Sequence, residues 1–144
     1  MTEKENKIPV SLKSLLTPSK TVGVDYPGFD GFSVSLTYLA REELLKLRNR
    51  SVHQKFNKKT RAYEEQLDND KFLTEYCKAI IKGWKGLKYK YLEELLLVDI
   101  SEVEPDDFLV WNHENAELLM KNSSDFDEWV SETVGELENF TKTK

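Results

Sequence analysis

A stripe of apolar side chains runs through residues 68–84 at steps of three and four, which predicts an amphipathic helix. Asp68 is a candidate N-cap, and Gly83 and Gly86 follow near the expected end. Because the stripe must be buried, other elements have to pack against this helix. Cys77 lies on the stripe, so we expect a packed core thiol rather than a nucleophile. The stripe consists of Phe72, Leu73, Tyr76, Cys77, Ile80, Ile81 and Trp84.

A β-hairpin is predicted near the N-terminus. Residues 21–26 are rich in β-formers, and residues 27–31 form a Pro/Gly turn cluster. Residues 32–38 alternate apolar and polar side chains, which places one apolar set on a single face. Two strands alone are marginally stable, so helices must cover that face. The apolar set is Phe32, Val34, Leu36 and Tyr38.

The remaining pattern predicts more helices and one long connection. Residues 52–67 are polar throughout and are expected to form a loop. The fold class predicted is therefore mainly α (α+β), with an N-terminal β-hairpin followed by about four to five packed helices. Residues 1–19 are expected to form a flexible or loosely docked arm, and residues 20–144 a single mainly helical domain. The further helices are predicted at residues 40–50, 89–97, 113–121 and 125–140.

Charge is divided unevenly along the chain, whose net charge is -5. Residues 1–92 hold 18 basic and 11 acidic residues, a net +7, whereas residues 93–144 hold 3 and 15, a net -12. One interpretation is two solvated faces of one domain. The other is a dipolar molecule, for which we expect weak self-association through opposite charges.

Several classes of chemistry are excluded by the residues present. The chain has one cysteine and two histidines, His53 and His113, far apart in sequence, so no Cys/His zinc site can be assembled. No glycine-rich loop is suited to phosphate binding, and adjacent carboxylates do not make a facing catalytic pair. We therefore expect no enzymatic activity, no metal and no cofactor. Apolar runs such as 95–98 are too short to span a membrane.

Two basic segments contain aromatic residues. Lys55, Lys58, Lys59 and Arg61 surround Phe56, and residues 84–91 alternate lysines, including Lys85, Lys88 and Lys90, with aromatic side chains. Such mixtures bind phosphates and stack on bases, which supports an alternative function as a nucleic-acid or nucleoprotein accessory protein. The acidic pI of about 5.2 argues against a nucleic-acid partner.

A series of short segments stands in a recognisable order along residues 20–140. They are residues 26–32, 36–44, 80–87, 91–95, 115–119, 124–129 and 137–140. The ordered series resembles the tail assembly chaperones of long non-contractile-tailed, siphovirus-like bacteriophages.

The resemblance implies a non-enzymatic protein of the host cell cytoplasm that is absent from the mature virion. It implies binding to the tape measure protein, which stays soluble until the major tail protein polymerises around it. It also implies that a longer, frameshifted form of the chain could exist as a further partner. Candidate partner-binding residues are those in excess of a small core or in the second basic segment: Leu12, Leu15, Leu16, Lys85, Lys88, Tyr89 and Trp111.

Overall fold

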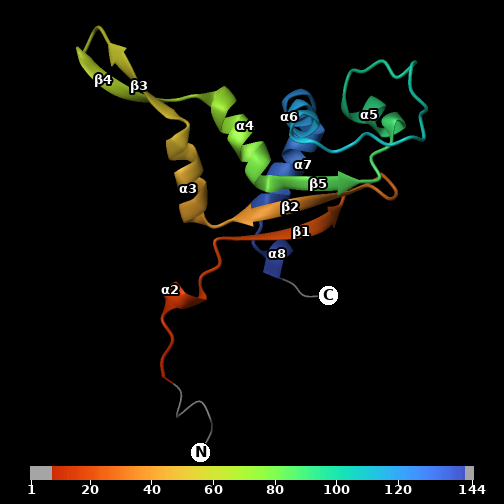
Figure 1. The fold of residues 1–144 in the computed structure, drawn as a ribbon. Helices are drawn as coiled ribbons and strands as arrows, with labels where there is room; N and C mark the ends of the chain where they lie inside the picture. Colours follow the sequence, from red (N-terminus) through yellow and green to blue (C-terminus); the bar gives the residue numbers. More distant parts are fainter. Residues whose placement is uncertain (1–7, 142–144) are drawn as a thin grey trace, which may run out of the picture.

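A three-stranded antiparallel sheet forms the centre of the molecule (Figure 1). In the computed structural model, which describes residues 8–141, β2 (Ser33–Leu39) lies between β1 (Ser19–Asp25) and β5 (Ile81–Lys85). The β1–β2 hairpin confirms the prediction for residues 21–38. Phe32, Val34 and Leu36 are buried, as the alternation requires, and Tyr38 is half-buried.

The helix predicted over residues 68–84 is shorter than expected. α4 (Asn69–Ile80) begins at the predicted cap, because the Asp68 carboxylate accepts a hydrogen bond of 3.1 Å from the Lys71 backbone N–H. The chain then continues as β5, where Trp84 pairs with Val34 of β2. The prediction of helix beyond Ile80 was wrong because pairing with β2 satisfies this backbone, and β-branched and aromatic residues fit a strand.

Helices pack against the central sheet and enclose the hydrophobic core. α6 (His113–Asn122) packs against α4 and α7 (Ser124–Gly135), α7 also packs against β2, and the short α5 (Tyr89–Leu95) follows β5. The last predicted helix, over residues 125–140, is divided, because α7 ends at Gly135 and α8 (Glu138–Thr141) follows as a separate turn. The largest fully buried side chains include Phe32, Phe126, Phe140, Leu36, Ile80, Ile81, Leu87 and Leu119.

A second, two-stranded sheet projects from the body (Figure 1). It consists of β3 (Val52–Asn57) and β4 (Ala62–Leu67), and it connects α3 (Arg41–Arg50) to α4. The prediction of an unstructured loop over residues 52–67 was therefore wrong. Both faces of this hairpin are exposed, so its sequence has no need of the apolar alternation by which a strand is recognised.

The predicted fold class was also wrong. Residues 8–141 contain seven helices and five strands, and the strands are distributed through the chain rather than confined to an N-terminal hairpin. β3, β4 and β5 all come after the first long helix, so no continuous helical bundle follows β2. Within residues 8–141, no helix combines the length and the apolar character needed to cross a membrane.

Candidate protein-interaction surface

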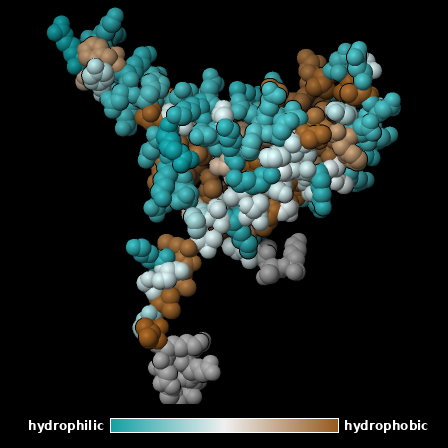
Figure 2. All heavy atoms as spheres, viewed as in Figure 1, coloured by the Kyte–Doolittle hydropathy of each residue, from teal (hydrophilic) through white to brown (hydrophobic). Residues whose placement is uncertain are grey.

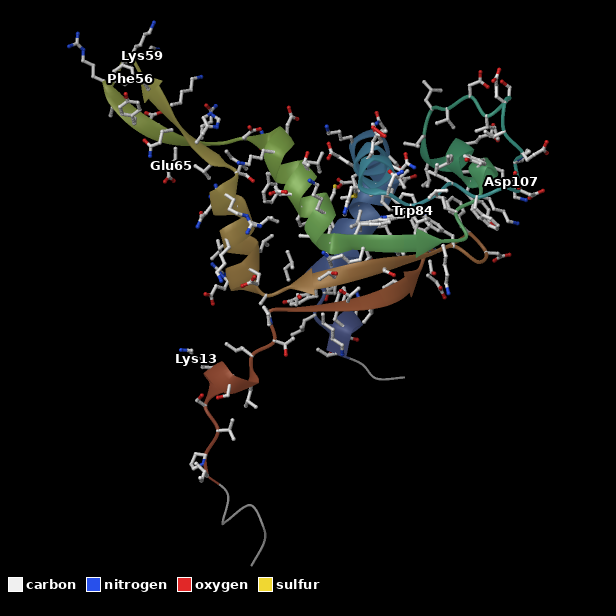
Figure 3. The ribbon with its side chains drawn as sticks, viewed as in Figure 1. Lys13, Phe56, Lys59, Glu65, Trp84 and Asp107 are labelled. Atoms are coloured by element: carbon white, nitrogen blue, oxygen red, sulfur yellow. The ribbon has the colours of Figure 1, made fainter. Side chains whose placement is uncertain are left out.

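The acidic loop, residues 96–112 between α5 and α6, lies at the opposite end of the molecule from the β3–β4 hairpin (Figures 1 and 3). It contains no lysine or arginine. Its side chains are mostly exposed, so its negative charge faces solvent. The carboxylates of the loop are Asp99, Glu102, Glu104, Asp106 and Asp107.

Backbone hydrogen bonds hold the acidic loop against the segment that follows β5. The Tyr89 N–H donates to the Asp107 carbonyl at 2.9 Å, and the Leu109 N–H donates to the Leu87 carbonyl at 2.8 Å. The Trp84 indole Nε1–H donates to the Leu109 carbonyl at 3.0 Å. The loop is thus fixed in place although it has no helix or strand of its own.

Ion pairs reinforce this attachment. Asp106 accepts from Lys90 Nζ at 2.9 Å and lies 3.7 Å from Lys88 Nζ. The hydrogen bond and the charge of Lys90 lower the pKa of Asp106, and Lys88 adds to this shift. Asp106 therefore engages two of the lysines of the second basic segment within the molecule, which leaves them less available to external phosphates.

An apolar groove adjoins the acidic loop. An open hollow of about 480 Å³ is lined by Leu96, Leu97, Val98, Leu118 and Asn122. Leu97 is fully exposed at 105%, and Leu118 of α6 is 51% exposed. Apolar side chains gather at this end of the molecule in Figure 2. Exposed apolar patches with polar rims are typical of protein-interaction sites.

The predicted arm leucines lie in a different place from this groove. Leu12 and Leu15 bound the short helix α2 (Leu12–Leu15), and Leu16 follows it. Their side chains are 64–69% exposed, and α2 stands apart from the body in Figure 1. The structure therefore presents these three residues to solvent but does not bring them to the other candidates.

The other predicted residues lie on or beside the acidic loop. Lys85 is exposed at the end of β5. Lys88 and Tyr89, half-buried, belong to the segment that binds the loop backbone. Trp111 is half-buried, with its ring 4.9 Å from that of His113, and its indole nitrogen is buried without a hydrogen-bond partner.

Sequence reasoning missed the groove residues Leu97, Val98 and Leu118. Leu97 was assigned to the helix predicted over residues 89–97, but α5 ends at Leu95. Leu118 falls within the helix predicted over residues 113–121, but the buried residues of α6 are Ala116, Leu119 and Met120. The three consecutive leucines at 95–97 were the available signal, because a helix cannot turn all of them towards one core.

Two observations on residues 8–141 concern reactive groups, namely the state of Cys77 and the placement of possible metal ligands. Cys77 is 2% exposed, and burial raises the pKa of its thiol to about 12, so it is no nucleophile near neutral pH. Among residues 8–141, no group of three or more His, Cys, Asp or Glu side chains is placed to hold a metal ion.

Compared with family models, with curated proteins and with solved structures, the chain matches none of them.

Proposed function

We propose that the protein is a phage tail assembly chaperone that binds the tape measure protein in the apolar groove. The proposal rests on the ordered segments described above, and the observation that carries it is the exposure of Leu97 and Leu118 beside the acidic loop. In this proposal the protein acts in the host cell cytoplasm, without catalysis, and leaves before the tail is complete. The major tail protein and a longer, frameshifted form are further proposed partners.

The groove has the properties that this task requires. A long tape measure helix exposes apolar stripes that aggregate when they are left bare. An open groove lined by aliphatic side chains can cover one turn of such a stripe, in the way amphipathic helices dock into grooves. The carboxylates of the acidic loop then keep the surface of the complex charged and hydrated.

Co-expression with the tape measure protein encoded by the same phage tests this proposal. We expect a higher soluble yield of that protein and a complex that survives pull-down. Leu118→Glu is expected to reduce the recovered complex, because it places a charge in the groove. Leu137→Glu is the matched control, since Leu137 is 53% exposed but does not line the groove.

The proposal fails if soluble yield is unchanged and no complex is recovered. If a complex forms but Leu118→Glu and Leu137→Glu behave alike, binding lies outside the groove and the assigned surface is wrong.

A further inference from the structure

The tip of the β3–β4 hairpin exposes an aromatic pair. Phe56 and Tyr63 are cross-strand neighbours, with ring centroids 5.3 Å apart and an interplanar angle of 67°. Phe56 is 47% exposed and Tyr63 is 70% exposed, so their outer surfaces face solvent. Figure 3 shows Phe56 and Lys59 together at the far end of the hairpin. Two large rings in this position contribute nothing to the central core.

The turn beyond the rings carries three cations, Lys58, Lys59 and Arg61. All three are exposed, and within residues 8–141 no carboxylate lies within ion-pair distance of them. Lys55, in β3 before the turn, is the cross-strand neighbour of Glu64 in the register of the hairpin. With Lys55, the hairpin carries four cations against the carboxylates of Glu64 and Glu65, so an excess of positive charge lies beside two exposed rings.

The hairpin is held at its base and shaped at its turn. The Asp68 N–H donates to the Ser51 carbonyl at 2.8 Å, which joins the two ends of the hairpin between α3 and α4. At the tip, the Asn57 side-chain oxygen accepts from the Lys59 backbone N–H at 2.8 Å, and its amide nitrogen donates to Glu64 at 2.9 Å. These contacts order the turn and engage the Glu64 carboxylate.

Arg61 occupies a strained backbone conformation. Its φ is 55°, and it is the one residue other than glycine with a positive φ in the described part of the chain. Glycine or asparagine adopts this region at lower cost. The residue here is an arginine instead, and backbone strain of this kind is concentrated at functional positions.

We propose that this tip binds single-stranded nucleic acid without sequence preference. Phe56 and Tyr63 stack on successive bases, and the three cations of the turn neutralise phosphates, which is the arrangement that sequence-tolerant single-strand binding requires. The inference is independent of the chaperone proposal, because the hairpin and the apolar groove lie at opposite ends of the molecule (Figure 1).

Two features of the structure favour this partner. The acidic pI describes the whole chain, whereas its densest negative charge lies in the distant acidic loop, and salt screens charges beyond about 8–10 Å. In addition, lysine is depleted from the cores of protein–protein interfaces, whereas lysines beside exposed rings are typical of single-strand binding.

Fluorescence anisotropy of the full-length protein with a labelled oligo(dT) of about 15 nucleotides tests the proposal. With three phosphate contacts, the slope of log K against log salt is expected to be about -2, so binding weakens about 20-fold between about 50 and 200 mM NaCl. Phe56→Ala and Tyr63→Ala are each expected to weaken binding about tenfold or more. Phe108→Ala is the matched control, because Phe108 is 56% exposed in the acidic loop.

Substitutions of the lysines test the phosphate contacts separately from the stacking of the two rings. Lys58→Gln combined with Lys59→Gln is expected to reduce the slope by about 1.4, because each phosphate contact contributes about 0.7 on a single strand. Lys13→Gln combined with Lys20→Gln removes the same charge from exposed positions elsewhere and is expected to leave binding unchanged. All four positions are exposed, so these substitutions leave the core intact.

Three results overturn the proposal. The first is no binding to oligo(dT) at low salt. The second is binding that the two control variants weaken as much as the tip variants do. The third is equal binding to a poly-glutamate peptide with the same dependence on Phe56, which would assign the tip to an acidic protein surface.

Discussion

The close approach of Gly86 to Gly31 offers a quantitative test of how the acidic loop is positioned. Gly86 has a φ of 76° and lies where the chain leaves β5. A Cβ at this position would overlap the Gly31 carbonyl oxygen and lie 2.7 Å from its carbonyl carbon. Because Gly86 has no Cβ, the β1–β2 turn can pack closely against the segment that holds the acidic loop.

Gly86→Ala is expected to destabilise the protein by about 2–4 kcal/mol. The left-handed backbone costs an alanine about 1 kcal/mol, and moving packed backbone costs about 1–3 kcal/mol more. Gly28 separates these two effects, because its φ is 88° but nothing lies within 4 Å of an added Cβ. Gly28→Ala is therefore expected to cost only about 1 kcal/mol. Gly83 has neither a positive φ nor an atom within 4 Å of an added Cβ. Gly83→Ala is therefore expected to change stability by less than about 0.5 kcal/mol.

Urea and thermal unfolding of the three variants measure this order. At roughly 3–5 °C for each kcal/mol in a domain of this size, Gly86→Ala is expected to lower the melting temperature by roughly 10 °C. If Gly86→Ala and Gly28→Ala agree within about 0.5 kcal/mol, the close approach of the two turns is refuted.

Two further substitutions and the titration of Cys77 test separate parts of the structure. Arg61→Gly is expected to stabilise the hairpin by up to about 1 kcal/mol, visible as slower hydrogen exchange in β3 and β4; unchanged exchange would contradict the strain at this position. Burial raises the pKa of Cys77 from 9.0 to about 12, so the unfolded chain loses this proton first and stability should fall as pH rises from 9 towards 12. Iodoacetamide should accordingly label Cys77 at pH 8 only after denaturation. Trp84→Phe removes the hydrogen bond to Leu109 and should cost about 1 kcal/mol in urea unfolding.

The sequence predicted the helix cap, the β1–β2 hairpin and the burial of Cys77, because each depends on residues close together in the chain. Asp68 caps α4 as expected, since its side-chain oxygen accepts from a backbone N–H three residues later, and Asn112 caps α6 in the same way. The β1–β2 hairpin follows from strict alternation around a glycine-containing turn. Cys77 is buried because it shares a helical stripe with Ile80, a relation that the sequence displays directly.

The structure departs from prediction where non-local pairing competes with local pattern. Ile81 and Trp84 continue the helical spacing of α4, but they also fit a strand, and β2 offers a partner 45 or more residues earlier in the chain. The spacing of apolar residues does not show whether this segment continues the helix or pairs with β2. Trp84 was expected to be largely buried as a helical residue, whereas on β5 it is half-buried and its indole donates to the acidic loop.

The candidate surfaces escaped prediction for a related reason. A solvent-exposed hairpin needs no apolar face, so β3 and β4 contain exposed polar residues that resemble a loop. The groove is lined mostly by apolar residues, of which Leu97 and Leu118 fall within predicted helices, where apolar residues are expected to be buried. Sequence pattern measures how apolar a residue is, but not whether another element covers it.

The fold separates in space the charges that are divided along the sequence. The acidic loop belongs to the negative half of the sequence, and the hairpin tip belongs to the positive half; the two lie at opposite ends of the molecule (Figure 3). Because α3, α4 and the central sheet separate them, neither end neutralises the other through direct contact. Lys88 and Lys90 of the positive half pair with Asp106 of the negative half, and these pairs fix the acidic loop in place. Each end therefore keeps its own charge, and in the two proposals a protein bound at the apolar groove leaves the hairpin tip accessible.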